Sequence, residues 1–291
     1  MSVNNLINNF VVRFANVNGT GSASANYLFA KAVFRMGIFA TPKNIFPSNI
    51  QGLPTWYDVR VSEKGYLGRR EGVDMMVSVN PQSMANDIKS VKTGGYFLYD
   101  STKDLPADYI REDINYIGVP LMEMCINEYS DPRQRQLFKN IIYVGALASL
   151  MNIEFEVLEQ LFKEQFAGKE KLIAPNVKAL QLGMDYIKQH YEYPLPIRLE
   201  RRDLIGDKIL IDGNSACGLG AVYGGATVAA WYPITPSTSV VEAYSEYVNK
   251  YRVDPKTGKN NFAIVQAEAR TGIFLEPKRV LVQTKPCLQR L

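Results

Sequence analysis

NFVVRFANVNGTGSASANYLFAKAVFRMG, residues 9–37, decides the fold class, because its pattern changes from that of a strand to that of a helix. Residues 9–15 have the apolar, β-branched character of a buried strand, and residues 23–36 have the apolar spacing of a helix. Gly19 and Gly21 permit a tight turn between the two. A strand, a glycine turn and a helix in this order predict a βα unit.

The turn at Gly19 and Gly21 is suited to a phosphate, since the start of a helix exposes unpaired N–H groups and the positive end of its dipole. A complete dinucleotide fingerprint would have a third glycine where Ser24 stands and an acidic residue about 20 residues further on. The predicted second strand, 38–43, ends without an acid. A Rossmann-type NAD-dependent dehydrogenase is therefore only the third interpretation. On its own, the motif is better explained as a turn whose small residues allow close packing.

The composition is that of an ordinary globular protein, with 46% hydrophobic and 21% charged residues among 291, enough for about two domains. The net charge of +4 lies in residues 269–291, which hold five basic residues and one acidic residue. The rest of the chain is neutral, so no basic surface for nucleic acid is predicted. The longest charge-free apolar run, 141–153, is too short to span a membrane. These features predict a cytoplasmic protein that binds neither nucleic acid nor membrane.

Cysteine and histidine are too few and too scattered for a metal site. Cys125, Cys217 and Cys287 form neither a disulfide framework nor a CxxC motif, and His190 is the one histidine. Zinc sites with several histidines and histidine-based triads are thereby excluded within this chain. We predict no metal ligands here, and any chemistry must come from a bound cofactor or a partner.

Strand and helix patterns alternate through the first two-thirds of the chain. Strands are predicted at 9–15, 55–61, 73–79, 95–99 and before Val119, and helices at 83–91, 131–151, 154–166 and 175–189. Asp131 can cap the second of these helices, and Pro132 fits the first helical position. Such alternation predicts a layered α/β fold with a mostly parallel sheet.

A proline-rich, charged stretch at 192–203 interrupts this alternation and is the best linker candidate. A second α/β pattern follows it, with a strand at 208–211, a helix from Gly213 and strands at 226–231 and 261–268. The sequence therefore predicts two α/β domains.

YPITPS, residues 232–237, leaves the end of a predicted strand. Its two prolines restrict the backbone and would hold the Thr235 hydroxyl where open α/β sheets bind ligands. A rigid strand-to-helix turn capped by Ser237 or Thr238 explains the same residues equally well. The physical argument alone leaves both interpretations open.

Two glycine-rich stretches, DGNSACGLGA (212–221) and GGATVAAWYPITPS (224–237), resemble the start of the alpha subunit of thiamine-diphosphate-dependent 2-oxoacid:ferredoxin (acceptor) oxidoreductases. The first part of the chain is similar to the gamma domain of the same enzymes. The residues that carry this second likeness are Gly19-Thr-Gly21, FPSNIQGLPTWY (46–57), YVGALA (143–148) and 176–183. The resemblance covers nearly all of residues 5–268.

The resemblance implies a gamma-type layered α/β domain followed by an incomplete thiamine-diphosphate pyrimidine-domain α/β fragment. We expect a gamma-like catalytic domain at 1–190, a linker at 191–207 and the start of the pyrimidine-binding domain at 208–268. Residues 269–291 form an atypical basic tail that departs from the family, so we expect them not to pack as part of the second domain. A truncated or frame-shifted product is the simplest explanation of this tail.

The implied activity is oxidative decarboxylation of a 2-oxoacid, of 2-oxoglutarate or pyruvate type, to an acyl-CoA with reduction of ferredoxin. The implied cofactors are thiamine diphosphate shared with a beta subunit, coenzyme A as co-substrate, and magnesium and iron-sulfur clusters on partner chains. The implied partners are that beta subunit, ferredoxin and the 2-oxoacid. The runner-up function is a non-enzymatic assembly or coenzyme-binding module, because the fragment cannot enclose thiamine diphosphate alone.

The resemblance also assigns candidate site residues. Thr235 would lie near the substrate and the thiazolium ring, and Glu268 would hydrogen-bond the pyrimidine ring nitrogen. The remaining cofactor-binding candidates are Tyr232, Pro233, Ile234, Pro236 and Ser237, with Gly19 and Gly21 for coenzyme A.

Overall fold

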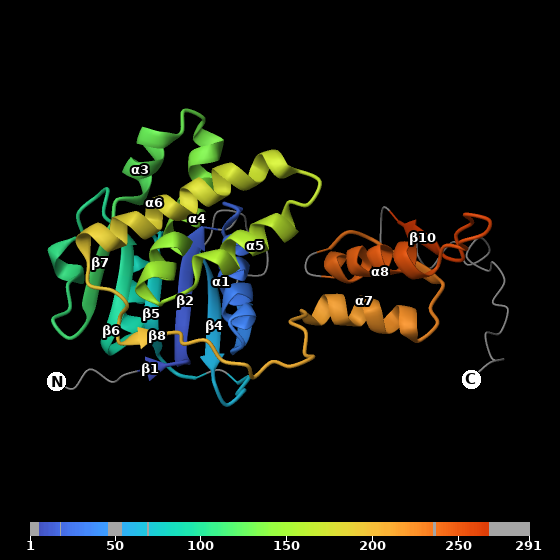
Figure 1. The fold of residues 1–291 in the computed structure, drawn as a ribbon, viewed down its shortest axis with the longest axis horizontal. Helices are drawn as coiled ribbons and strands as arrows, with labels where there is room; N and C mark the ends of the chain where they lie inside the picture. The colour runs from blue at the N-terminus through green and yellow to red at the C-terminus, as the bar shows by residue number, and fades with distance from the viewer. Residues whose placement is uncertain (1–5, 18, 46–53, 69, 235–236, 268–291) are drawn as a thin grey trace. The chain divides into compact units, whose positions relative to one another are not determined.

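The computed structural model describes residues 6–17, 19–45, 54–68, 70–234 and 237–267. The chain divides into two compact units, Met1–Lys208 and Ile209–Leu291. Figure 1 shows their elements, which are described below for each unit by itself. Among the described residues, no helix combines the length and the apolar character needed to cross a membrane.

A six-stranded sheet with the order β3-β4-β2-β5-β6-β7 forms the centre of the first unit. The strands are β2 (Asn9–Val17), β3 (Phe39–Ile45), β4 (Pro54–Ser62), β5 (Val73–Ser78), β6 (Val91–Asp100) and β7 (Asn115–Val119). Strands β2, β5, β6 and β7 run parallel, whereas β4 is antiparallel to both β2 and β3. The predicted α/β class with a mostly parallel sheet is confirmed. The antiparallel pairing of β4 at one edge was not predicted. A short parallel pair, β1 (Leu6–Ile7) and β8 (Ile197–Arg198), forms a separate sheet.

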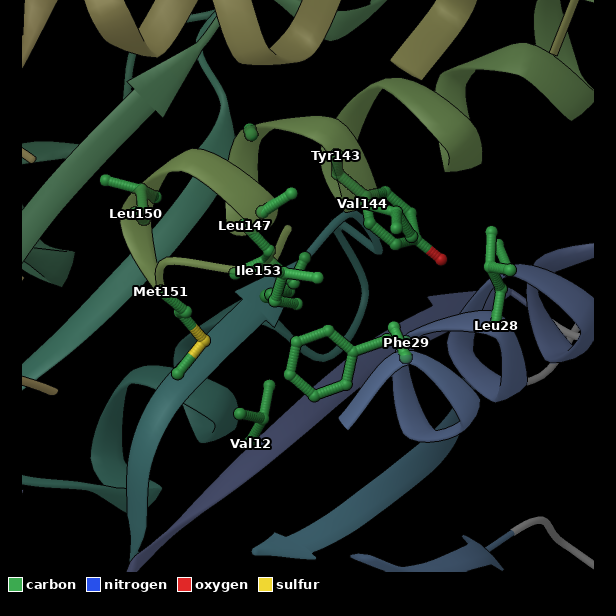
Figure 2. Packing of buried hydrophobic residues seen from close by; sticks show 14 of the residues in the cluster. Val12, Leu28, Phe29, Tyr143, Val144, Leu147, Leu150, Met151 and Ile153 are labelled. Carbon is green, nitrogen blue, oxygen red and sulfur yellow. The ribbon is translucent and has the colours of Figure 1, made fainter. Parts of the chain in front are cut away.

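Helices cover both faces of the large sheet. The helices are α1 (Ser22–Arg35), α2 (Met84–Ser90), α3 (Leu121–Glu128), α4 (Pro132–Leu150), α5 (Phe155–Gln165) and α6 (Ile173–His190), with 3₁₀ turns at Ala107–Tyr109 and Glu170–Leu172. The main core joins α1, α4, α5 and α6 to one face, and Figure 2 shows Val12 of β2, Phe29 of α1 and Leu147 of α4 within it. A smaller cluster that includes Ile88 of α2 covers the other face.

The start of α4 follows the sequence prediction. Asp131 precedes the helix and accepts a 2.9 Å hydrogen bond from the backbone N–H of Arg133, while Pro132 is the first helical residue. A carboxylate cap satisfies one of the N–H groups that the first turn leaves unpaired. These two adjacent residues therefore define where the long central helix begins.

Residues 191–207, assigned to a linker from their prolines and charges, are part of the first unit. Ile197 and Leu199 are buried, and the backbone N–H of Leu199 donates a 2.9 Å hydrogen bond to the carbonyl of Met151. Arg202 makes the same kind of backbone bond to Met36. Apolar residues between the charged ones carry this contact, so composition alone did not reveal it.

The second unit contains α7 (Gly213–Tyr223), β9 (Val228–Trp231), α8 (Thr238–Tyr251) and β10 (Ala263–Gln266). Strands β9 and β10 pair in parallel. Helices α7 and α8 meet at Gly218, where an added Cβ would lie 2.8 Å from the backbone nitrogen of Tyr244. The predicted strand at 208–211 is wrong: these residues are not a strand, and Ile209 is 71% exposed. An apolar run becomes a strand only when a neighbouring strand pairs with it.

Candidate functional site

The parallel strands of the first unit create a crevice at their carboxyl ends. After β2 the chain turns to α1, which packs on one face of the sheet, and after β5 it turns to α2, on the other face. The connections therefore diverge between two neighbouring parallel strands. Open α/β sheets bind their ligands at such a switch point, outside the carboxyl ends of the strands.

The predicted glycine turn follows the carboxyl end of β2. Gly19 and Gly21 have φ angles of 84° and 76°, a left-handed conformation that favours glycine. Gly21 directly precedes α1 and, being glycine, has no side chain with which to cap it. Backbone N–H groups at the start of a helix suit an anion, and binding of a phosphate at this turn stays a prediction.

A cavity of about 210 Å³ borders the turn. Its lining residues are Asn16, Gly19, Gly21, Ser22, Ala23, Asn26, Asn44, Thr55, Trp56 and Tyr57. Both predicted glycines therefore contribute to one concave site, together with side chains from three strands and one helix.

Buried asparagines form the polar side of this cavity. The Asn26 amide donates a 2.9 Å hydrogen bond to Asn16 Oδ1, and the Tyr143 hydroxyl donates one of 2.6 Å to Asn26 Oδ1. Asn16 is 1% exposed, yet its Nδ2 has no hydrogen-bond partner among the described residues. A buried donor without a partner is unfavourable, so Asn16 is ready to donate to a ligand oxygen.

Asp87 holds the indole on the other side of the cavity. Its carboxylate accepts hydrogen bonds from Trp56 Nε1 at 2.8 Å, Ser83 Oγ at 2.7 Å and Ser78 Oγ at 3.1 Å. Burial raises the pKa of Asp87, against the opposing effect of these hydrogen bonds and of Arg13. The network fixes the position of Trp56, whose ring lines the cavity.

The sequence patterns did not indicate Asn16, Asn26, Asp87, or Trp56 as a lining residue. Asn16 could have been found, because a polar residue at the end of a buried strand, just before a glycine turn, lies where ligands bind. Asp87 gave no such signal, since Trp56, the cavity residue that donates to it, lies 31 residues away in the sequence.

In the second unit, the described part of YPITPS forms a hydrogen-bonded turn. Ser237 Oγ donates a 2.9 Å bond to the carbonyl of Ile234, and the Ile234 N–H donates a 3.1 Å bond to Thr238 Oγ1. Ser237 precedes α8 without capping it through its side chain. Tyr232 is half-buried and Pro233 is exposed. Thr235, Pro236 and Glu268 lie outside the described residues.

The two strands of the second unit end at the same edge. Gln266 pairs with Trp231 in the parallel register, and the backbone N–H of Ala267 donates a 2.7 Å bond to the Trp231 carbonyl. The Trp231 indole N–H is buried and has no partner among the described residues. The end of β9 therefore carries a buried donor that has no partner among the described residues.

Within the described ranges, no group of three or more histidine, cysteine or acidic residues is arranged to hold a metal ion. Cys125 is buried and Cys217 is exposed. His190 is exposed at the end of α6, where its ring stacks on Tyr186 at a centroid distance of 4.2 Å.

Comparison with known proteins gives a family match over residues 11–186, to the model described as pyruvate ferredoxin/flavodoxin oxidoreductase. The alpha subunit of 2-oxoacid:ferredoxin oxidoreductase 2 from Aeropyrum pernix is 24% identical, covering 76% of this chain and 40% of that protein. The alpha subunit of 2-oxoacid:ferredoxin oxidoreductase from Saccharolobus solfataricus is also 24% identical, covering 86% of this chain and 45% of that protein. The chain spans less than half the length of these relatives.

Solved structures show the same relationship. The 2-oxoglutarate:ferredoxin oxidoreductase from Magnetococcus marinus, with 2-oxoglutarate, coenzyme A and succinyl-CoA bound, matches with a TM-score of 0.72 and 28% identity, covering 90% of this chain and 43% of that chain. The gamma subunit of a keto/oxoacid ferredoxin oxidoreductase from Geobacter sulfurreducens matches with a TM-score of 0.50 and 20% identity, covering 62% of this chain and 99% of that chain. At that identity, the second likeness shows the fold alone.

Proposed function

Because the chain belongs to the pyruvate ferredoxin/flavodoxin oxidoreductase family, we propose that it is part of a 2-oxoacid:ferredoxin oxidoreductase, with a gamma-type domain preceding the start of an alpha subunit. The complex oxidatively decarboxylates a 2-oxoacid to an acyl-CoA and reduces ferredoxin. The observation that carries this proposal is the likeness to the Magnetococcus marinus enzyme, which covers 90% of this chain. The family match favours neither the assembly-module interpretation nor the NAD-dependent dehydrogenase.

The glycine turn of the first unit is the proposed coenzyme A site. The unpaired N–H groups at the start of α1 and its positive dipole end attract a phosphate of the coenzyme, and the turn at Gly19 and Gly21 leaves the backbone accessible. Asn16 Nδ2, buried and without a partner among the described residues, donates to an acceptor oxygen of the ligand. Because the donor is fixed by Asn26 and Tyr143, it needs little reordering on binding.

The proposed thiamine diphosphate site includes the YPITPS turn of the second unit. Thiamine diphosphate supplies, when bound, an electron sink for decarboxylation of the 2-oxoacid. The Trp231 indole N–H, buried and without a partner among the described residues, and the shared edge of β9 and β10 support a polar ligand there. Thr235 lies against the substrate in this proposal, and Glu268 shares a proton with the pyrimidine nitrogen.

Other chains complete this second site. The remaining residues of the turn, Tyr232, Pro233, Ile234, Pro236 and Ser237, pack around the pyrimidine. A beta subunit contributes the diphosphate site, the magnesium ion and an iron-sulfur cluster, and ferredoxin receives the electrons.

The function is tested by producing the full chain with its candidate beta subunit and measuring the reduction of a viologen dye. Pyruvate and 2-oxoglutarate are compared, each with and without coenzyme A. We expect one 2-oxoacid to reduce the dye only when coenzyme A is present, and Thr235→Val to lower kcat with the complex still assembled. A stable complex that reduces no dye with either acid contradicts the enzymatic proposal.

A further inference from the structure

A second cavity, of about 670 Å³, lies at the carboxyl ends of β5 and β6. It shares no lining residue with the cavity at the glycine turn. Much of its wall is apolar, formed by Val17, Val79, Met84, Leu105, Tyr109 and Met122. Its volume falls in the range of small-molecule sites, which measure roughly 300–1,000 Å³ and combine apolar walls with a few polar groups.

Lys139 of α4 is the buried polar group of this cavity. The residue is 8% exposed and lines the cavity, and its ammonium has no hydrogen-bond or ion-pair partner within the described part of the chain. A buried ammonium is unfavourable unless an anion or several acceptors compensate for lost water. The cavity is the space in which such an anion would meet Nζ.

The other charged residues of the cavity do not supply that anion. Asp100 Oδ1 accepts hydrogen bonds from Thr102 Oγ1 at 2.6 Å and from the backbone N–H of Met122 at 3.3 Å. Asp100 therefore holds its own loop and the start of α3. Lys103 and Asp104 also line the cavity, are exposed and are opposite in charge, so together they add no net charge to its lining.

We propose that this cavity binds a small organic anion that carries one acidic group on an apolar or aromatic body. The body lies against the apolar wall, and the acidic group pairs with Nζ of Lys139. A charge-assisted hydrogen bond in a partly dry site is stronger than its counterpart in water. The site therefore discriminates a carboxylate from an uncharged molecule of the same shape.

Two probes of matched shape test the proposal on the full chain: 3-phenylpropanoate and 3-phenylpropanamide. Their affinities are measured by calorimetric titration for the unmodified chain, Lys139→Met and Lys103→Met. The expected preference of the unmodified chain for the carboxylate is about tenfold or more, from the usual strength of a hydrogen bond to a charged group. Lys139→Met removes this preference, and Lys103→Met, which changes an exposed lysine of the same cavity, retains it.

A second measurement on the unmodified chain covers the case in which Lys139→Met does not fold. Lysines are acylated with a limiting reagent, and each site is quantified by peptide mass spectrometry with and without 3-phenylpropanoate. We expect the probe to slow modification of Lys139 and to leave exposed Lys188 of α6 unchanged. Equal affinity for the two probes, retained preference in a folded Lys139→Met variant, or unprotected Lys139 would each overturn the proposal.

Discussion

The hydroxyl of Tyr143 in α4 donates a 2.6 Å hydrogen bond to Asn26 Oδ1 in α1, directly behind the glycine turn. Both residues are buried, and the Asn26 amide in turn donates a hydrogen bond to Asn16 Oδ1. The long central helix and the helix that follows the turn are thus coupled through a polar contact inside an apolar core. The orientation of the Asn16 side chain depends on this contact.

Tyr143→Phe removes one donor and leaves the buried Asn26 oxygen without it. We expect the free energy of unfolding to fall by about 1–3 kcal/mol, the usual effect of an unsatisfied buried acceptor. Tyr129→Phe is the matched control, because the Tyr129 hydroxyl is buried without a partner among the described residues. Urea unfolding of both variants gives the answer, and an equal loss in the two would contradict a specific role for the Tyr143 hydroxyl.

Gly21→Asp places a negative charge at the start of α1, where the proposed site holds a phosphate. Coenzyme A affinity is expected to fall about tenfold relative to Gly21→Asn, which has the same size without the charge. Both side chains tolerate the left-handed backbone at this position, where φ is 76°. Calorimetric titration of the two variants separates charge from shape, and identical affinities would exclude the turn as the phosphate site.

Gly145→Ala should disrupt the contact between α4 and α6. An added Cβ would lie 2.0 Å from the carbonyl oxygen of Leu180, and one on Gly183 would lie 1.9 Å from that of Ile142. Backbone atoms cannot move aside as a flexible side chain can, so we expect a loss of about 1–3 kcal/mol or more in unfolding free energy. Gly220→Ala in α7 is the control: no atom of the described residues lies within 4 Å of its added Cβ, so it should not destabilise. Thermal unfolding that left Gly145→Ala unchanged would contradict the close packing.

The pKa values of two aspartates should be shifted in opposite directions from that of an unperturbed aspartate. Burial raises the pKa of Asp87 above the 3.8 of an unperturbed aspartate, whereas the hydrogen bond from Arg111 lowers the pKa of Asp113 to about 2. Carboxyl carbon NMR titration, with Asp87→Asn and Asp113→Asn for assignment, measures both values directly. A pKa of Asp87 below that of Asp113 would contradict the structure.

The consequence of the Asp87 shift for stability follows from its sign. The folded chain keeps the Asp87 proton to higher pH than the unfolded chain does. Its contribution to the free energy of unfolding is therefore complete below pH 3.8 and falls as pH rises through the folded pKa. Urea unfolding should accordingly show that the unmodified chain exceeds Asp87→Asn in free energy of unfolding by an amount that shrinks as pH rises from 3.8 through the folded pKa of Asp87. An advantage that grows with pH would reverse the assigned sign.

Cysteine reactivity should differ sharply between the two described thiols. Burial raises the pKa of Cys125 to about 11, so its thiolate is scarce at pH 8, and the residue is also inaccessible. Cys217 is exposed. Alkylation at pH 8 followed by peptide mass spectrometry should modify Cys217 quickly and Cys125 only after unfolding. Equal rates in the folded chain would show that the helix α3 is not packed as described.

Local signals in the sequence determined several helices and strands and the glycine turn of the candidate site. The pattern of residues 9–37 predicted β2, the turn and α1, because periodicity and glycine conformation are decided within a few residues. Asp131 and Pro132 fixed the start of α4 for the same reason. The resemblance carried by Gly19-Thr-Gly21 and by the glycine-rich stretches at 212–221 and 224–237 indicated the family, and the comparisons confirmed it.

Long-range pairing was decided only by the tertiary structure. Residues 208–211, predicted as a strand, pair with none of the described strands. Asp87 becomes part of a site because Trp56, 31 residues away, donates to it. Lys139 has no distinctive neighbours in the sequence; it matters because α4 buries it at a cavity formed by other elements. A side chain's burial and partners depend on where distant segments pack. The free energy that favours this packing comes from contacts throughout the core, so it is not encoded in the residues near that side chain.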